Sequence, residues 1–184
     1  MQNYFLEVRE GILPFLSILL LIGNSPVYAQ SKHAHEHGKG NLEITLDKSR
    51  MVGKLKIPLE ALVGFERLPK TEVENNAIND LNQKLANPAT FFVMNKEAEC
   101  SPKVLENTIV RDTAGKHADL HYQFDLNCSK PANLKQMSIT LFANYKRLKE
   151  IKVESVGPAG QKSTTAKPQS NIILLNWQFP QTQV

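Results

Sequence analysis

The feature that most constrains the fold of this chain is a strict alternation of apolar and polar residues in two neighbouring segments. In LEITLD (residues 42–47) and MVGKLKI (residues 51–57), every second residue is apolar or glycine. Alternate side chains of a β-strand project from the same face of a sheet, so each segment predicts a strand with one buried face. The polar stretch DKSR between them predicts a turn, and the whole region predicts an antiparallel hairpin.

Further along the chain, helical spacing replaces alternation and then gives way to it again. In residues 70–88, apolar residues recur at helical spacing, Thr71 and Glu74 form a capping-box pair and Pro88 ends the run, which predicts a helix. HADLHYQFDLNC (117–128) alternates and predicts a second clear strand. Two more strands are predicted, at LKEIKVESVG (148–157) and NIILLNW (171–177). Two segments are ambiguous: TFFVMN (90–95) is a strand or buried turn, and MSITLFANY (137–145) is a strand or short helix. The other two are connections, with PLEALVGFERLP (58–69) as an apolar connector and GPAGQKSTTAKPQS (157–170) as a polar loop.

These elements predict an α+β fold, in which an antiparallel β-sheet is covered by one or two helices. HGKGNLEITLD and HADLHYQFDLN both place a histidine just before an alternating strand, which indicates a weak internal repeat. The composition, with 41% hydrophobic and 22% charged residues, is that of an ordinary globular protein.

The first 29 residues have the pattern of a secretion signal. The apolar run GILPFLSILLLIG is too short to span a membrane comfortably, and small residues precede a cleavage point between Ala29 and Gln30. The segment before the run is not positively charged, so an uncleaved anchor and a misassigned start stay open as alternatives. The predicted organisation is a signal peptide at 1–29, a flexible His-rich segment at 30–40 and a single α+β metal-binding domain at 41–184, with no membrane span in the mature chain.

The charge of the chain indicates which partners are disfavoured, and its cysteines bear on the compartment. The formal net charge is +4, but acidic residues are mixed with the basic ones throughout, and no clustered basic face predicts a nucleic-acid partner. The two cysteines, Cys100 and Cys128, are an even number in a chain predicted to enter an oxidising compartment, so we predict one disulfide between them. The alternative is a pair of buried thiols; a cysteine metal site or redox pair is disfavoured because no C-x-x-C occurs.

The five histidines fall into two groups, which are 33/35/37 and 117/121. Alternate residues of a strand lie about 6.6 Å apart on one face, so neighbouring histidines of the first group can converge on one zinc ion. His117 and His121 are too far apart along a strand to share an ion alone, but each has Asp119 beside it on the same face. A complete zinc site needs three or four ligands. The hypothesis is therefore a shared site in which the N-terminal histidines fold across the strand.

Metal binding is not the only interpretation of these residues. The histidines could equally belong to a solvated leader and an exposed strand face. Glu36 and Glu66 are further candidate oxygen ligands. Imidazole binds copper and nickel as well as zinc, so the residues alone do not choose the metal. The candidate metal ligands from this argument are His33, His35, His37, His117, Asp119 and His121.

The chain resembles the ZrgA-like family of bacterial zinc-regulated periplasmic zinc-binding proteins. The segments that carry the resemblance are HAHEHGKGNLEITLD (33–47), LVGFERLPKT (62–71), HADLHYQFDLNC (117–128) and LFANYKRLKEIKVESVGPAGQ (141–161). The resemblance implies a periplasmic zinc-binding protein that works beside an ABC-type zinc importer. It also implies zinc ligation by the His-rich start and by the strand motif at 117–121. Related sequences often have a histidine after Gly-Phe-Glu, where this chain has Arg67, and some carry a long His-rich insert that is absent here. Both departures imply fewer bound ions, and the first argues against Glu66 as a ligand.

The expected function is that of a periplasmic accessory protein that captures or buffers zinc for an ABC-type uptake system. The alternative is a metal-independent periplasmic adaptor or structural protein. We expect no enzymatic activity, because neither H-E-x-x-H nor G-x-S-x-G occurs and HEH lacks a rigid scaffold.

Overall fold

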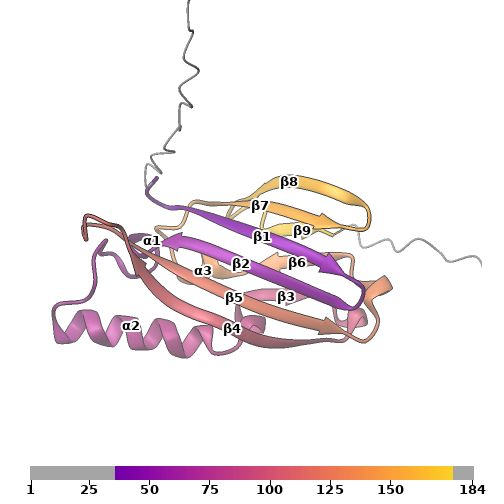
Figure 1. Cartoon of the computed structure of the whole chain (residues 1–184), viewed down its shortest axis with the longest axis horizontal. Helices are drawn as coiled ribbons and strands as arrows, with labels where there is room; N and C mark the ends of the chain where they lie inside the picture. Colours follow the sequence, from indigo (N-terminus) through magenta and orange to yellow (C-terminus); the bar gives the residue numbers. More distant parts are fainter. Residues whose placement is uncertain (1–35, 176–184) are drawn as a thin grey trace, which may run out of the picture. The chain divides into compact units, whose positions relative to one another are not determined.

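The computed structural model describes residues 36–175, and strands dominate this part of the chain (Figure 1). Strands account for 49% of it and helices for 23%. In chain order, the elements are β1 (Lys39–Asp47), β2 (Arg50–Pro58), α1 (Leu59–Val63), α2 (Glu72–Leu85), η1 (Pro88–Thr90), β3 (Phe92–Met94), η2 (Lys96–Ala98), β4 (Cys100–Arg111), β5 (Ala118–Cys128), η3 (Pro131–Asn133), β6 (Gln136–Ile139), α3 (Leu141–Asn144), β7 (Glu150–Gly157), β8 (Gly160–Ala166) and β9 (Ile172–Leu174).

The strands form two sheets, and the predicted α+β class is wrong. A six-stranded sheet has the order β4-β5-β2-β1-β7-β8 and a three-stranded sheet has the order β3-β6-β9. The large sheet is mixed rather than antiparallel, because β1 pairs with β7 in parallel. The second sheet contributes to the core, since Phe92 of β3 stacks on Phe124 of β5 with ring centroids 4.3 Å apart. Helices therefore do not cover the large sheet by themselves, and the domain is mostly β.

The hairpin predicted from alternation is confirmed. β1 and β2 pair antiparallel, with Leu46 opposite Met51, and the alternating apolar residues that predicted the hairpin are buried. Gly53 interrupts the apolar series because the Phe124 ring of β5 occupies the space beside it. A Cβ atom at Gly53 would lie 2.2 Å from that ring, so glycine permits the close approach of the two strands.

The predicted capping box and the end of the helix are also confirmed in α2. The Thr71 side chain accepts a hydrogen bond from the Glu74 backbone N–H, and the Glu74 carboxylate accepts one from the Thr71 N–H, both at 3.2 Å. The buried face consists of Ile78, Leu81 and Leu85, whereas Val73 is 79% exposed and outside the core. The Tyr122 hydroxyl donates to the Leu85 carbonyl at 2.8 Å, which joins the end of α2 to β5.

The other segments were predicted with mixed success. The strand predictions for the segments of β5, β7 and β9 are confirmed. TFFVMN contains β3, and MSITLFANY contains both alternatives, since β6 is followed by α3. The connector at 58–69 contains α1, and the segment predicted as a polar loop contains β8. The longest strand, β4, was not predicted at all. Both β4 and β8 lie at edges of the large sheet and most of their residues are exposed, so they lack the alternation that marks a half-buried strand.

The weak internal repeat does not extend beyond the two strands that suggested it. After β1 the chain turns back into the β1–β2 hairpin of the large sheet. After β5 it passes to β6, which belongs to the three-stranded sheet. The likeness is therefore confined to two histidine-preceded strands.

The predicted disulfide between Cys100 and Cys128 is present. These residues face each other at one end of the β4–β5 pair, so the bond fastens the edge strand to its neighbour. A disulfide is typical of a chain that matures in an oxidising compartment outside the cytoplasm. Within residues 36–175, no helix has the length and hydropathy to cross a bilayer.

Reduction of this bond is expected to destabilise the domain. The two cysteines are 28 residues apart, and releasing a loop of that size lowers the free energy of unfolding by about 3.6 kcal/mol on the loop-entropy model. Urea denaturation of oxidised protein and of reduced, thiol-blocked protein measures the difference. The double variant Cys100→Ser/Cys128→Ala is the control, because a reductant should leave its midpoint unchanged. Equal midpoints for oxidised and reduced wild-type protein would contradict the prediction.

Candidate metal centre

The strand order of the large sheet brings two distant histidines to one end of it. β2 lies between β1 and β5 and is antiparallel to both, so β1 and β5 start where β2 ends. Asp119, near the start of β5, pairs with Pro58, the last residue of β2. His37 lies just before β1 and His117 just before β5. The two histidines therefore flank the end of β2 from opposite sides.

Backbone contacts hold the residue that follows His37. Gly38 has a φ of +74°, a conformation that favours glycine, and a Cβ atom there would lie 2.5 Å from the Arg147 carbonyl oxygen. The Gly38 carbonyl accepts hydrogen bonds from Lys149 N at 2.7 Å and from Glu150 N at 3.2 Å. The entry to β1 is thereby fixed against the start of β7. Lys39 and Gly40, the last residues of the predicted His-rich segment, belong to β1.

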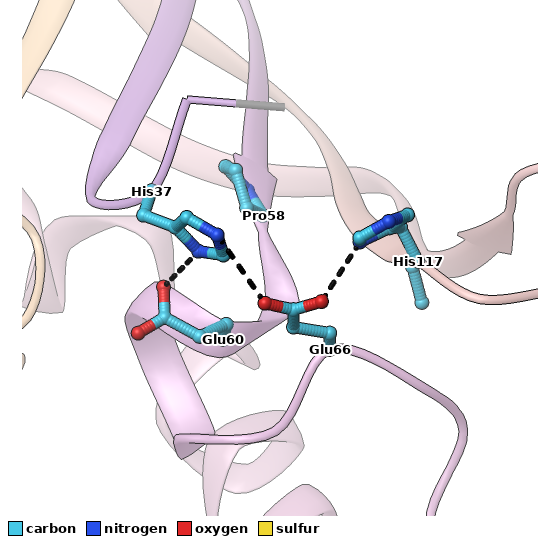
Figure 2. Close-up of a pocket in the computed structure, with 6 residues that line it drawn as sticks. His37, Pro58, Glu60, Glu66 and His117 are labelled. Carbon is cyan, nitrogen blue, oxygen red and sulfur yellow. Dashed lines mark ion pairs between the residues drawn. The ribbon is translucent and has the colours of Figure 1, made fainter. Parts of the chain in front are cut away.

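Two glutamates from the chain that follows β2 lie beside these histidines (Figure 2). His37 Nδ1 lies 3.5 Å from Glu60 Oε2, and His37 Nε2 lies 3.4 Å from Glu66 Oε1. The second oxygen of Glu66, Oε2, lies 2.9 Å from His117 Nδ1. Glu66 therefore joins the two histidines with its two carboxylate oxygens. We call His37, Glu60, Glu66 and His117 the His–Glu cluster.

The His–Glu cluster surrounds a pocket of ionic size. Its lining consists of His37, Pro58, Glu60, Glu66, His117 and Ala118, and the free space among them is about that of one water molecule. The pocket is open to solvent, since the His37 and His117 side chains are 63% and 35% exposed. Such a space is large enough for a single ion.

Glu60 directs one carboxylate oxygen toward the pocket and the other toward the guanidinium group of Arg147. Glu60 Oε1 lies 3.8 Å from Arg147 Nε. Glu60 Oε2 is buried, and within residues 36–175 it has no hydrogen-bond partner, although it faces His37. A buried carboxylate oxygen without a hydrogen bond has lost hydration energy, and a bound cation would compensate for that loss.

One contact in the cluster has the spacing of two ligands on a zinc ion. Two ligand atoms at about 2.0–2.1 Å from a tetrahedral zinc are about 3.3 Å from each other. The contact between His37 Nε2 and Glu66 Oε1, at 3.4 Å, matches this spacing. The 2.9 Å contact with His117 is instead of hydrogen-bond length. Within the described residues, no three His, Cys, Asp or Glu side chains are already arranged to hold a metal ion. Binding in the pocket therefore requires side-chain rotation.

Of the other candidate ligands, those within the described residues do not line the pocket. His33 and His35 are outside the described residues. Asp119 is only 6% exposed and forms an ion pair with Lys56 at 3.1 Å. His121 is half-buried on β5 between Lys56 and Thr108 of the neighbouring strands. Neither Asp119 nor His121 lines the pocket.

The structure places the glutamates differently from the sequence-based expectation. Glu36 forms an ion pair with Lys39 at 2.7 Å. Glu66 was named only as a further oxygen candidate, and Arg67 beside it argued against that role, yet Glu66 is the centre of the cluster. Glu60 was not proposed as a ligand, because its segment was predicted only as an apolar connector. The signal that could have found it is its place in the first turn of α1, directly after a strand that ends beside the histidines.

Arg67 makes its main contact with the capping residue of α2. Its guanidinium donates to both carboxylate oxygens of Glu74, with Nη2 2.8 Å from Oε1 and Nη1 3.0 Å from Oε2. These hydrogen bonds, together with those from the Lys70 and Thr71 backbone N–H groups, lower the pKa of Glu74 to about 2.

Comparison with protein families gives a match over the described residues. A family model described as ZrgA family zinc uptake protein matches residues 34–175, which is most of the chain. A search of the curated proteins found no match.

The lowered pKa of Glu74 predicts an acid-dependent contribution to stability. A carboxyl whose pKa is lowered by folding stabilises the native state above its ordinary pKa of 4.5, and this contribution is lost as the pH falls toward 2. Glu74→Gln is expected to lower the melting temperature at pH 7, and the gap between variant and wild type should narrow toward pH 2. Glu72→Gln, in the same first turn, is the matched control. A gap that stays constant from pH 7 to pH 2 would show that the ionised carboxylate is not responsible.

Proposed function

Because the chain belongs to the ZrgA family of zinc uptake proteins, we propose that it is a periplasmic accessory protein that captures zinc and supplies it to an ABC-type importer. The observation that carries this proposal is the contact of His37 and His117, 80 positions apart in the sequence, with the two oxygens of one glutamate. The proposed zinc site is the His–Glu cluster.

The chemistry of the His–Glu cluster supports zinc as the cargo. Imidazole nitrogen and carboxylate oxygen are both zinc ligands, and a zinc site takes three or four of them. Two carboxylates also balance the charge of one divalent cation. The same donors accept copper(II) and nickel(II), so the preference for zinc comes from the family.

The exposure of the site supports capture and transfer more than permanent retention. A structural zinc site is closed, with four protein ligands around the ion. Here His37 is 63% exposed and Glu66 is 38% exposed, so another protein can reach the ligands. The role that we propose is binding, without catalysis.

The N-terminal histidines extend this proposal. His33 and His35 precede His37 by four and two positions, which is near enough for either to join an ion bound at the cluster. They lie outside the described residues, and their participation stays a prediction. The disulfide supports the proposed compartment, since such bonds persist in the periplasm.

Zinc titration of the full chain tests the site directly. His37→Ala and His117→Ala are each expected to weaken zinc binding by at least about tenfold, because even outer-shell partners of a metal contribute tenfold to a hundredfold. Glu66→Gln should have a similar effect. The measurement is calorimetry in competition with a chelator of known zinc affinity, and a parallel titration with copper(II) and nickel(II) measures the selectivity.

Two further variants serve as comparisons in that titration. His121→Ala removes a histidine of β5 that does not line the pocket, so the zinc affinity of this variant should equal that of wild type. His33→Ala/His35→Ala measures the contribution of the N-terminal pair. If His37→Ala and His117→Ala bind zinc as tightly as wild type, the cluster is not the zinc site.

A growth experiment distinguishes a zinc-dependent role from a metal-independent adaptor. In a strain that lacks the native protein, His37→Ala/His117→Ala should fail to restore growth in zinc-depleted medium and should be equivalent to wild type in zinc-replete medium. Immunoblotting controls for protein level. Full restoration of growth in depleted medium would favour the adaptor alternative.

A further inference from the structure

The loop that carries Glu66 has little backbone support of its own. It runs from Gly64 to Thr71, between α1 and α2. Gly64 N donates to the Glu60 carbonyl at 2.9 Å, but within the described residues no backbone–backbone hydrogen bond involves residues 65–70. Side chains must therefore fix the conformation of this loop.

The Glu74 carboxylate supplies most of that support. Besides the two bonds from Arg67, it accepts hydrogen bonds from Lys70 N at 2.7 Å and from Thr71 N at 3.2 Å. Arg67 Nη1 also donates to the Leu68 carbonyl at 2.9 Å. A bidentate contact between guanidinium and carboxylate fixes the relative orientation of the two groups as well as their distance. The residue directly after Glu66 is thereby attached to the first turn of α2.

The residue before Glu66 is anchored from the other side. Phe65 is partly buried and packs against the hydrophobic core. The Arg67 guanidinium carbon lies 6.0 Å from the centre of the Phe65 ring, within the range of a cation–π contact. Both neighbours of Glu66 are thus held, and its carboxylate is left to reach the histidines.

We propose that the Arg67–Glu74 pair positions Glu66 for zinc. It holds the loop so that the Glu66 carboxylate lies between His37 and His117 before the ion arrives. Neither Arg67 nor Glu74 touches the pocket, so both are positioning residues rather than ligands. This inference rests on the proposed function, because it concerns the same zinc site.

The energetic basis is pre-organisation. A ligand on a loose loop must be ordered when the ion binds, and that cost reduces the affinity. Loss of an outer-shell partner typically weakens metal binding tenfold to a hundredfold. Arg67→Ala is expected to weaken zinc binding within this range. It keeps the hydrogen bonds between Glu74 and the backbone of residues 70 and 71, so α2 should retain its cap.

A double-mutant cycle distinguishes positioning from a general effect on the fold. If Arg67 acts through Glu66, Arg67→Ala should have no further effect on zinc affinity once Glu66→Gln is present, because coupled residues are not additive. A purely structural role predicts the same fold-change in both backgrounds. Lys70→Ala, which removes another basic side chain of the same loop, is the matched control and should bind zinc as wild type does.

The experiment measures zinc affinity of the full chain by competition calorimetry, with circular dichroism and thermal unfolding as checks of folding. The expected result is a loss of about tenfold or more for Arg67→Ala in the wild-type background and less than about twofold in the Glu66→Gln background. Arg67→Lys keeps the charge but not the bidentate contact, so it should bind zinc more tightly than Arg67→Ala and more weakly than wild type. If Arg67→Ala does not fold, Glu74→Gln with Glu72→Gln as control takes its place in the same cycle.

The outcomes separate this inference from the proposed function. If His37→Ala and His117→Ala lose zinc but Arg67→Ala binds as wild type does, the positioning role is wrong and the zinc site stands. Equal losses for Arg67→Ala with and without Glu66→Gln would also overturn the positioning role. If the histidine variants bind zinc normally, the proposed site itself is wrong.

Discussion

The antiparallel pairing of β2 with both of its neighbours is the constraint on which the candidate site depends. A strand between two antiparallel partners ends where both partners begin, so β1 and β5 enter the sheet beside Pro58. The histidine before each strand is therefore brought to the same place. The chain that leaves β2 must pass between them, and it carries Glu60 and Glu66. Each side chain of the His–Glu cluster is thus at the start or just beyond the end of one of three adjacent strands.

Sequence patterns predicted those elements whose apolar residues repeat at the period of the element because one face of it is buried. The β1–β2 hairpin alternates because one face is buried, and α2 begins at a capping box whose two hydrogen bonds are both present. β4 and β8 could not be predicted in this way, because edge strands with mostly exposed residues show no such alternation. The fold class was wrong for a different reason. The segments of β3 and β9 were recognised as candidate strands, but the sequence did not show that both pair with β6 in a second sheet, from which Phe92 contributes to the core.

The sequence predicted a site shared by the two histidine groups but not the geometry of the cluster. The structure brings one member of each group, His37 and His117, to Glu66, and zinc ligation by them stays a prediction. Asp119 and His121 share the strand but do not line the pocket. What the sequence could not show is that β2 separates β1 from β5, since strand order is a long-range property. Without knowledge of that strand order, nothing in the sequence indicates that Glu60 and Glu66 lie beside the two histidines.

The two carboxylates of the cluster differ in how their charge is balanced. Arg147 lies beside Glu60, whereas Arg67 only follows Glu66 in the sequence. Arg67, however, is bound to Glu74 through both of its terminal nitrogens and is not available to Glu66. Glu66 therefore keeps both oxygens for the histidines, while the more enclosed Glu60 shares its charge with Arg147. A cation entering the pocket meets one carboxylate that is already partly balanced and one that is not. One unbalanced carboxylate at a site open to solvent is consistent with the capture and transfer of zinc that we propose.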